Sequence, residues 1–192
     1  MKTKDLFRGA MMSLCAVVMA TMMSCNLTNR NNPDNPSTNP KDTTATSDSY
    51  QGAYAQYAYA ATDDMIDLFY VKIEYLDGDG KMQTVTLTEP SWAKRVDAKS
   101  LPAKFGMRVN ITMKGMADQT KYKSIALNYT ASYISMLKDA NGKTVGTVHK
   151  NVFDADKTIA PNELSEWVVN YQKKPVQFWF EYDAKGNFKL SE

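Results

Sequence analysis

The 192-residue sequence has very few of the side chains from which most active sites and metal sites are built. It contains one histidine, His149, and two cysteines, Cys15 and Cys25. A Ser-His-Asp arrangement needs a histidine oriented beside a serine, and no Gly-x-Ser-x-Gly turn accompanies His149. One histidine and so few thiols also supply too few nitrogen and sulfur ligands for a zinc site. We therefore predict a protein without catalytic activity, metal or cofactor.

Two groups of carboxylates suggest other chemistry but have simpler explanations. Asp77 and Asp79 alternate with glycines, yet a calcium loop would need a third spaced oxygen ligand and a closing glutamate. These residue types are those of a tight turn between strands. Glu163 and Glu166 could be paired acids of a glycosidase, but their spacing places them in the first turns of a helix, where negative charge is favourable.

The sequence also lacks an apolar run long enough for a permanent membrane helix, which needs about 20 residues. The uncharged residues 10–23 come closest, and they follow the basic residues Lys2, Lys4 and Arg8. This length and this basic flank are typical of the hydrophobic region of a secretory signal. The sequence therefore predicts export.

The apolar run ends in Met22-Met23-Ser24-Cys25. This segment resembles the lipobox of bacterial lipoproteins, in which an apolar, a variable and a small residue precede a cysteine. Met22 stands where that family prefers leucine. The resemblance implies that signal peptidase II recognises Met22, Met23 and Ser24, removes residues 1–24, and leaves Cys25 with a diacylglyceryl group on its nucleophilic sulfur. The alternative is an ordinary secretory signal with an incidental cysteine.

Neither sign of charge dominates the chain. Of 23 basic and 21 acidic residues, the signal segment removes three basic and one acidic residue, which leaves 20 of each. A neutral exported domain is a poor candidate for nucleic-acid binding or for electrostatic membrane binding. We expect attachment through lipid instead, because two or more acyl chains anchor a protein stably.

Residues 25–49 are rich in Asn, Pro, Thr and Ser and have almost no apolar side chains. Such a segment cannot offset its ordering entropy by burial, so we predict a disordered tether. Its reach as a flexible coil would be about 25–30 Å. It lacks the acidic cluster that often follows the cysteine in surface-exposed lipoproteins of Bacteroides-like bacteria. We expect the outer membrane, with the periplasmic or the surface face left open.

Residues 50–192 are predicted to form a single domain with alternating apolar and polar side chains. The alternation is clearest in residues 105–114 and is also present in residues 65–75, 125–133 and 176–182. Within this part we interpret residues 91–103 as a connection, residues 139–142 as a turn and residues 144–149 as a short strand. The apolar phase shifts by one at Ile134 and Met136, which suggests a bulge or a bend. Leu164 to Tyr171 are expected to form one helix capped by Asn162.

Together these segments predict a mainly β protein. We expect an antiparallel β-sandwich of Ig-like architecture, with about seven strands and one short helix near the C-terminus. With the lipobox, the whole arrangement is similar to small Bacteroides-type lipoproteins of uncharacterised function.

Aromatic side chains offer the remaining candidates for binding. Trp179 falls in the outward phase of its strand, Trp92 lies in the expected connection, and Tyr54, Tyr57 and Tyr59 are close together in residues 50–61. Exposed rings of this kind stack on sugars or on partner side chains. The alternative is that the tyrosines belong to a first strand on the core and that a helix covers Trp179.

We therefore expect a lipid-anchored cell-envelope protein with a non-catalytic binding or structural domain that interacts with another envelope protein. The alternative is a glycan-binding lipoprotein that uses these exposed aromatic side chains.

Overall fold

The computed structural model describes residues 50–115 and 121–191. The predicted signal segment and tether lie outside the described residues. Strands make up 57% of the described part, and the predicted antiparallel β-sandwich with a short C-terminal helix is confirmed. The described residues contain more strands than the seven or so that we expected.

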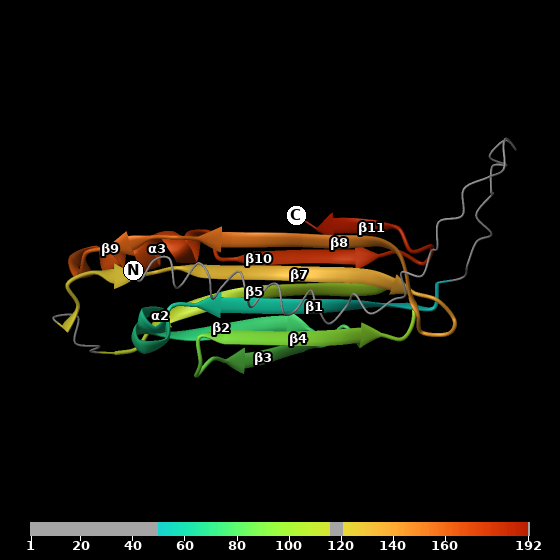
Figure 1. The fold of residues 1–192 in the computed structure, drawn as a ribbon, viewed down its shortest axis with the longest axis horizontal. Coiled ribbons are helices and arrows are strands. Elements are labelled where there is room, and N and C mark those ends of the chain that lie inside the picture. The colour runs from blue at the N-terminus through green and yellow to red at the C-terminus, as the bar shows by residue number, and fades with distance from the viewer. Residues whose placement is uncertain (1–49, 116–120, 192) are drawn as a thin grey trace, which may run out of the picture. The chain divides into compact units, whose positions relative to one another are not determined.

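Two antiparallel sheets form the sandwich (Figure 1). Sheet A has four strands, in the order β4 (Ser91–Ala98), β1 (Gly52–Ala61), β7 (Tyr129–Lys138) and β8 (Thr144–Ala155). Sheet B has five, in the order β11 (Phe188–Ser191), β10 (Gln177–Tyr182), β5 (Ala103–Met113), β2 (Phe69–Leu76) and β3 (Met82–Thr86). A short pair, β6 (Ile125–Ala126) and β9 (Thr158–Ile159), completes the strands.

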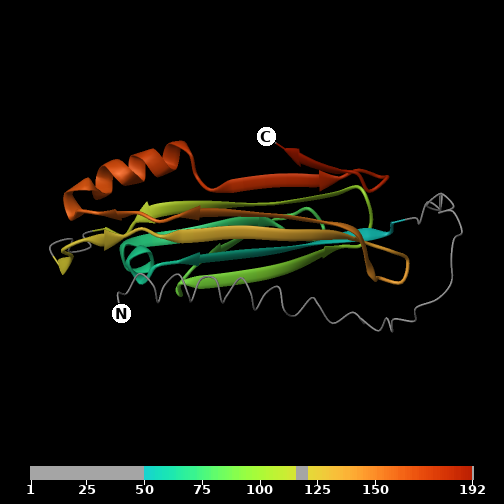
Figure 2. The same ribbon diagram turned by 45° about the horizontal axis from the view of Figure 1, so that its top comes forward.

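The helices α2 (Asp63–Leu68) and α3 (Leu164–Lys173) lie near the same end of the strands (Figure 1). Figure 2 shows α3 just before β10, from a turned view. Its buried side chains are the apolar i, i+4, i+7 positions Leu164, Val168 and Tyr171, as the sequence predicted. The Tyr171 hydroxyl donates to the Val109 carbonyl oxygen at 3.1 Å. The helix therefore packs on β5.

Alternating apolar residues from the inner faces of both sheets fill the core. Tyr133 of sheet A joins the two layers, because its ring centroid lies 4.8 Å from that of Phe178 and 4.6 Å from that of Phe180. Phe180 also stacks on Phe105 of the neighbouring strand at 5.5 Å. Close-packed rings of this kind dominate core energetics, so the aromatic content of the chain is largely used for stability.

Four local predictions were wrong. Residues 91–98 form strand β4, paired along its length with β1, and are no loop. Met65 lies in α2 and not on a strand. The helix α3 follows a 3-10 turn, η2 (Pro161–Glu163), so Asn162 lies in that turn and is not its cap. The apolar phase of β7 does not shift at Ile134, because Ser135 and Leu137 stay buried. The irregularity expected at this point is nevertheless present, as a register shift between Ser135 and Leu137 in the pairing with β8.

The two outer edges of sheet A differ. At β4, the turn between β2 and β3 approaches so closely that a Cβ on Gly78 would lie within 2.6 Å of the Asp97 carbonyl carbon. At β8, none of the described residues adds a further strand. One edge of sheet A is therefore partly covered, whereas the other presents an open strand.

Candidate functional site

The predicted lipidation site and its recognition residues, Cys25 with Met22, Met23 and Ser24, lie outside the described residues. In the described part of the chain, no helix combines the length and the apolar character needed to span a membrane.

The predicted aromatic strip of β1 is not on the surface. Tyr57 and Tyr59 face the core and are fully buried. Tyr54 lies on the other face of β1, is 1% exposed, and has the guanidinium of Arg95 over its ring at 4.1 Å. The alternative interpretation is confirmed: the three tyrosines belong to a first strand, β1, that packs on the core. None of the three rings is available for stacking on a ligand.

The burial of Tyr57 includes a specific polar role. Its hydroxyl donates to the Leu76 carbonyl oxygen at 3.1 Å and accepts the main-chain N–H of Gly106, also at 3.1 Å. Burial raises the pKa of Tyr57 well above its ordinary value, so the phenol stays neutral. The side chain thereby links β1 of sheet A to two strands of sheet B.

Trp92 and Trp179 do not share a surface. Trp92 sits on the core side of β4, opposite Tyr59 in register, and packs on Tyr75 at 5.2 Å. Trp179 lies on the outer face of sheet B, opposite Gly106 in register. Both side chains are only partly exposed. Because the two indoles belong to different sheets, they do not form one platform for a sugar ring.

The helix that covers Trp179 in the alternative interpretation contacts other rings. Trp167 of α3 packs on Phe69 at 5.7 Å and on Tyr171 at 5.4 Å. What Trp179 rests on is the backbone of β5: a Cβ on Gly106 would lie 2.7 Å from the Cδ2 atom of the indole. A glycine on the neighbouring strand thus allows a large ring to lie close to the sheet.

The carboxylate of Glu74 is bound by three neighbouring side chains of sheet B. Glu74 Oε2 accepts hydrogen bonds from Arg108 Nη2 and Asn110 Nδ2, both at 3.0 Å, and Glu74 Oε1 lies 3.3 Å from Lys72 Nζ. The hydrogen bond from Arg108 is the main cause that lowers the pKa of Glu74. The contacts with Arg108 and Asn110 fix β2 against β5 and leave Glu74 fully paired.

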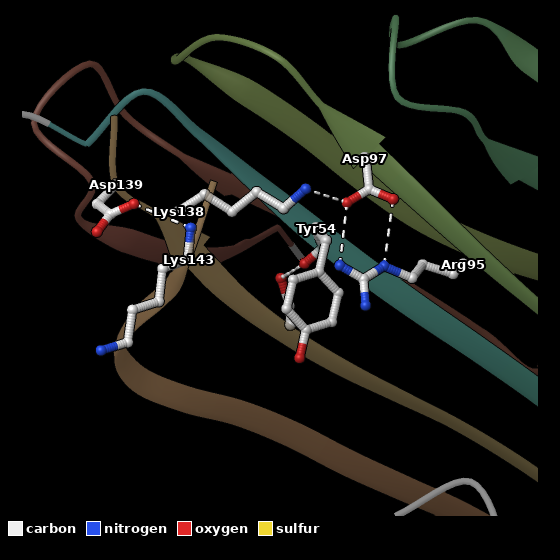
Figure 3. A network of polar contacts seen from close by, with 7 residues as sticks. Tyr54, Arg95, Asp97, Lys138, Asp139 and Lys143 are labelled. Carbon is white, nitrogen blue, oxygen red and sulfur yellow. Dashed lines mark hydrogen bonds and ion pairs between the residues drawn. The ribbon is translucent and has the colours of Figure 1, made fainter. Parts of the chain in front are cut away.

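A second charged cluster lies on sheet A around Asp97 (Figure 3). Arg95 donates to both carboxylate oxygens of Asp97 at 3.2 Å, and Lys138 Nζ donates to Oδ1. Burial acts to raise the pKa of Asp97, but the hydrogen bonds from Arg95 and Lys138 outweigh it and the pKa is lowered. The cluster is an ion-pair network that secures β4 to β7 across β1 and shields the ring of Tyr54.

His149 is part of the packing between the sheets. Its ring stacks on Phe188 with centroids 3.8 Å apart and an angle of 3° between the planes, and it lies opposite Ser135 in register. Burial lowers the pKa of His149. Within the described residues, no three His, Cys, Asp or Glu side chains are grouped so that they could hold a metal ion.

The surface that sequence reasoning missed is the outer face of β8. We expected a strand of residues 144–149, but β8 continues to Ala155. In its regular part, Lys150, Val152 and Asp154 alternate toward the outside and are exposed. The alternation of residues 149–155 was a usable signal, although polar residues on both faces made it weak.

No match was found for this chain in a scan against protein-family models, in a search of curated proteins, or in a search of solved structures.

Proposed function

We propose that this protein is an exported, lipid-anchored component of the bacterial cell envelope, held at the outer membrane through Cys25. Its β-sandwich acts by contact with another protein of the envelope and not by catalysis. Neither nucleic acid nor a cofactor takes part. The observation that carries the proposal is the sequence Met22-Met23-Ser24-Cys25 after a basic segment and an uncharged apolar run.

Two features of the folded domain support a role in contact. The single histidine is stacked on Phe188, and the tyrosines of β1 are buried, so the side chains most often used in chemistry or in sugar stacking contribute to packing here. The exposed groups are instead strand faces and an open strand edge. Such surfaces bind other proteins, since an unpaired edge is a template for a further strand.

The anchoring is tested by replacing Cys25 with serine in the producing bacterium. A hydroxyl does not take the place of the thiolate nucleophile, so C25S should lose incorporation of a palmitate analogue and leave the membrane fraction. Cys15→Ser is the matched control, because Cys15 lies inside the apolar run and should leave with it. Unchanged labelling and membrane retention of C25S would refute the anchor.

The contact role is tested by placing a photo-crosslinking amino acid at exposed positions in cells. Tyr70, Val152 and Val169 are about half exposed and lie on sheet B, sheet A and α3 respectively. We expect a defined adduct at one of these positions and not at all three, since a specific interface covers one face. Failure to form an adduct at any of them would reject a protein-binding role for these faces.

A further inference from the structure

Strand β8 has the features of a self-complementary edge. Its pairing with β7 is regular from His149 to Ala155, before the irregularity opposite residues 135–137. Val152 is the midpoint of this regular stretch and is 49% exposed. Edge strands that are long and unprotected pair readily with another strand. Which strand pairs with this one depends on the side chains on either side of Val152.

The charges on this stretch are placed symmetrically about Val152. On the outer face, Lys150 precedes Val152 by two residues and Asp154 follows it by two. If a second β8 lies antiparallel with Val152 opposite Val152, each Lys150 lies directly opposite an Asp154 of the other copy. Opposite charges in directly opposed positions stabilise a strand pair, and like charges destabilise it. No other register of β8 against itself pairs both charges.

The main-chain N–H of Val152 is bonded to a neighbouring side chain, which a second strand would have to displace. It donates to the side-chain oxygen of Asn151 at 2.8 Å, so a side chain and not a neighbouring strand satisfies it. Among the described residues, neither Lys150 nor Asp154 has an ion-pair partner. The edge thus offers an apolar centre flanked by two unpaired charges of opposite sign.

We propose that two copies of this chain associate through β8, antiparallel about a twofold axis at Val152, and so join their four-stranded sheets into one continuous eight-stranded sheet. Two Lys150–Asp154 ion pairs flank the axis. An isologous contact of this kind closes after two copies. The proposal does not depend on the lipid anchor, but confinement of both copies to one membrane would raise their effective concentration.

The register is tested by cysteine cross-linking of the full chain in cell membranes. Opposed residues of a hydrogen-bonded antiparallel pair have Cα atoms about 5.5 Å apart, which is within the range of a disulfide. Val152→Cys should therefore form a covalent dimer on mild oxidation. Lys150→Cys should not, because the two Lys150 positions are four residues apart along the strands, roughly 13 Å. Co-expressed K150C and D154C chains should cross-link to each other.

The charge pairing is tested in the V152C background. Lys150→Asp or Asp154→Lys alone places two like charges opposite each other at both 150–154 contacts of the dimer. We therefore expect the dimer yield to fall about tenfold. The double change K150D with D154K restores opposite charges and should restore the yield. Val169→Cys, at an exposed position on α3, measures the background from random collision.

Two results would overturn the proposal: cross-linking of V152C no greater than that of V169C, or equal cross-linking of V152C and K150C. Either could occur with the protein still lipidated and in the membrane fraction, so failure here is distinguishable from failure of the anchor. An adduct of V152C with a different protein, without the covalent dimer, would likewise overturn it in favour of another occupant of the same edge.

Discussion

The indole of Trp179 lies against the backbone of Gly106, its partner in register on the neighbouring strand, on the outer face of sheet B. A Cβ at Gly106 would lie 2.6 Å from the Phe178 carbonyl oxygen and 2.7 Å from the indole Cδ2 atom. Both distances are below any that real Cβ atoms adopt. The ring and the strand can take these positions only because residue 106 has no side chain.

We therefore expect Gly106→Ala to destabilise the fold. The indole and the β10 backbone would have to shift, and overpacking of this kind costs about 1–3 kcal/mol. Chemical unfolding measures the cost, and the tryptophan fluorescence of the folded state should change because Trp179 moves. Gly115→Ala is the control, since no atom of the described residues lies within 4 Å of a Cβ there. Equal stability of the two variants would contradict this account of Trp179.

The second prediction compares two buried tyrosines of β1. Tyr57→Phe leaves the buried N–H of Gly106 and the Leu76 carbonyl without their partner, and an unsatisfied buried group costs about 1–3 kcal/mol. Tyr59 differs only in that its buried hydroxyl has no hydrogen-bond partner in the described structure. Tyr59→Phe should therefore be neutral or slightly stabilising. Equilibrium unfolding of both variants checks the difference, and a larger loss in Y59F would contradict it.

The third prediction concerns alkaline pH. Burial raises the pKa of Tyr182 to about 12 and raises that of Tyr59 well above the ordinary value. As pH rises above about 10, the unfolded chain loses phenol protons that the folded chain retains. The contribution of these tyrosines to the free energy of unfolding should therefore be constant below about pH 10 and fall above it. Denaturant midpoints against pH, followed together with phenolate absorbance, test this. Tyr59→Phe should make the fall less steep.

The fourth prediction concerns the acid side and His149. Burial lowers its pKa from 6.5, so the unfolded chain takes up a proton first as pH falls below about 6.5. The stability that depends on neutral His149 is present above that pH and is lost as pH falls through the folded pKa. His149→Phe keeps an aromatic ring stacked on Phe188 and removes the group that titrates. Between about pH 6.5 and 5, the variant should lose less stability than the natural chain.

The carboxylates separate this effect from other acid-sensitive groups. The pKa values of Glu74 and Asp97 are lowered by their hydrogen bonds to Arg108 and Arg95, so their contribution is lost only below about pH 4. An unchanged stability profile in H149F between neutral pH and pH 5 would show that burial of His149 has no energetic consequence.

The sequence by itself determined the class of the fold. Strict alternation in residues 105–113 and 177–182 matches strands with one face on the core, and alternation is a local property that survives without knowledge of partners. The spacing of Leu164, Val168 and Tyr171 likewise identified α3. The turns at residues 77–80 and 139–142 could be predicted from their Asp and Gly residues. In each turn the first aspartate accepts hydrogen bonds from main-chain N–H groups two and four residues later, so the turn depends only on nearby residues.

Only the tertiary structure decided which surfaces the side chains occupy. Residues 91–98 carry four charged or polar exposed side chains and read as a loop, yet they form an edge strand because β1 supplies their hydrogen bonds. Trp92 and Trp179 look alike in sequence, but strand order places them on different sheets. The match of Lys150 to Asp154 about Val152 exists only because β8 is left at an edge, and strand order is a long-range property that no local pattern encodes.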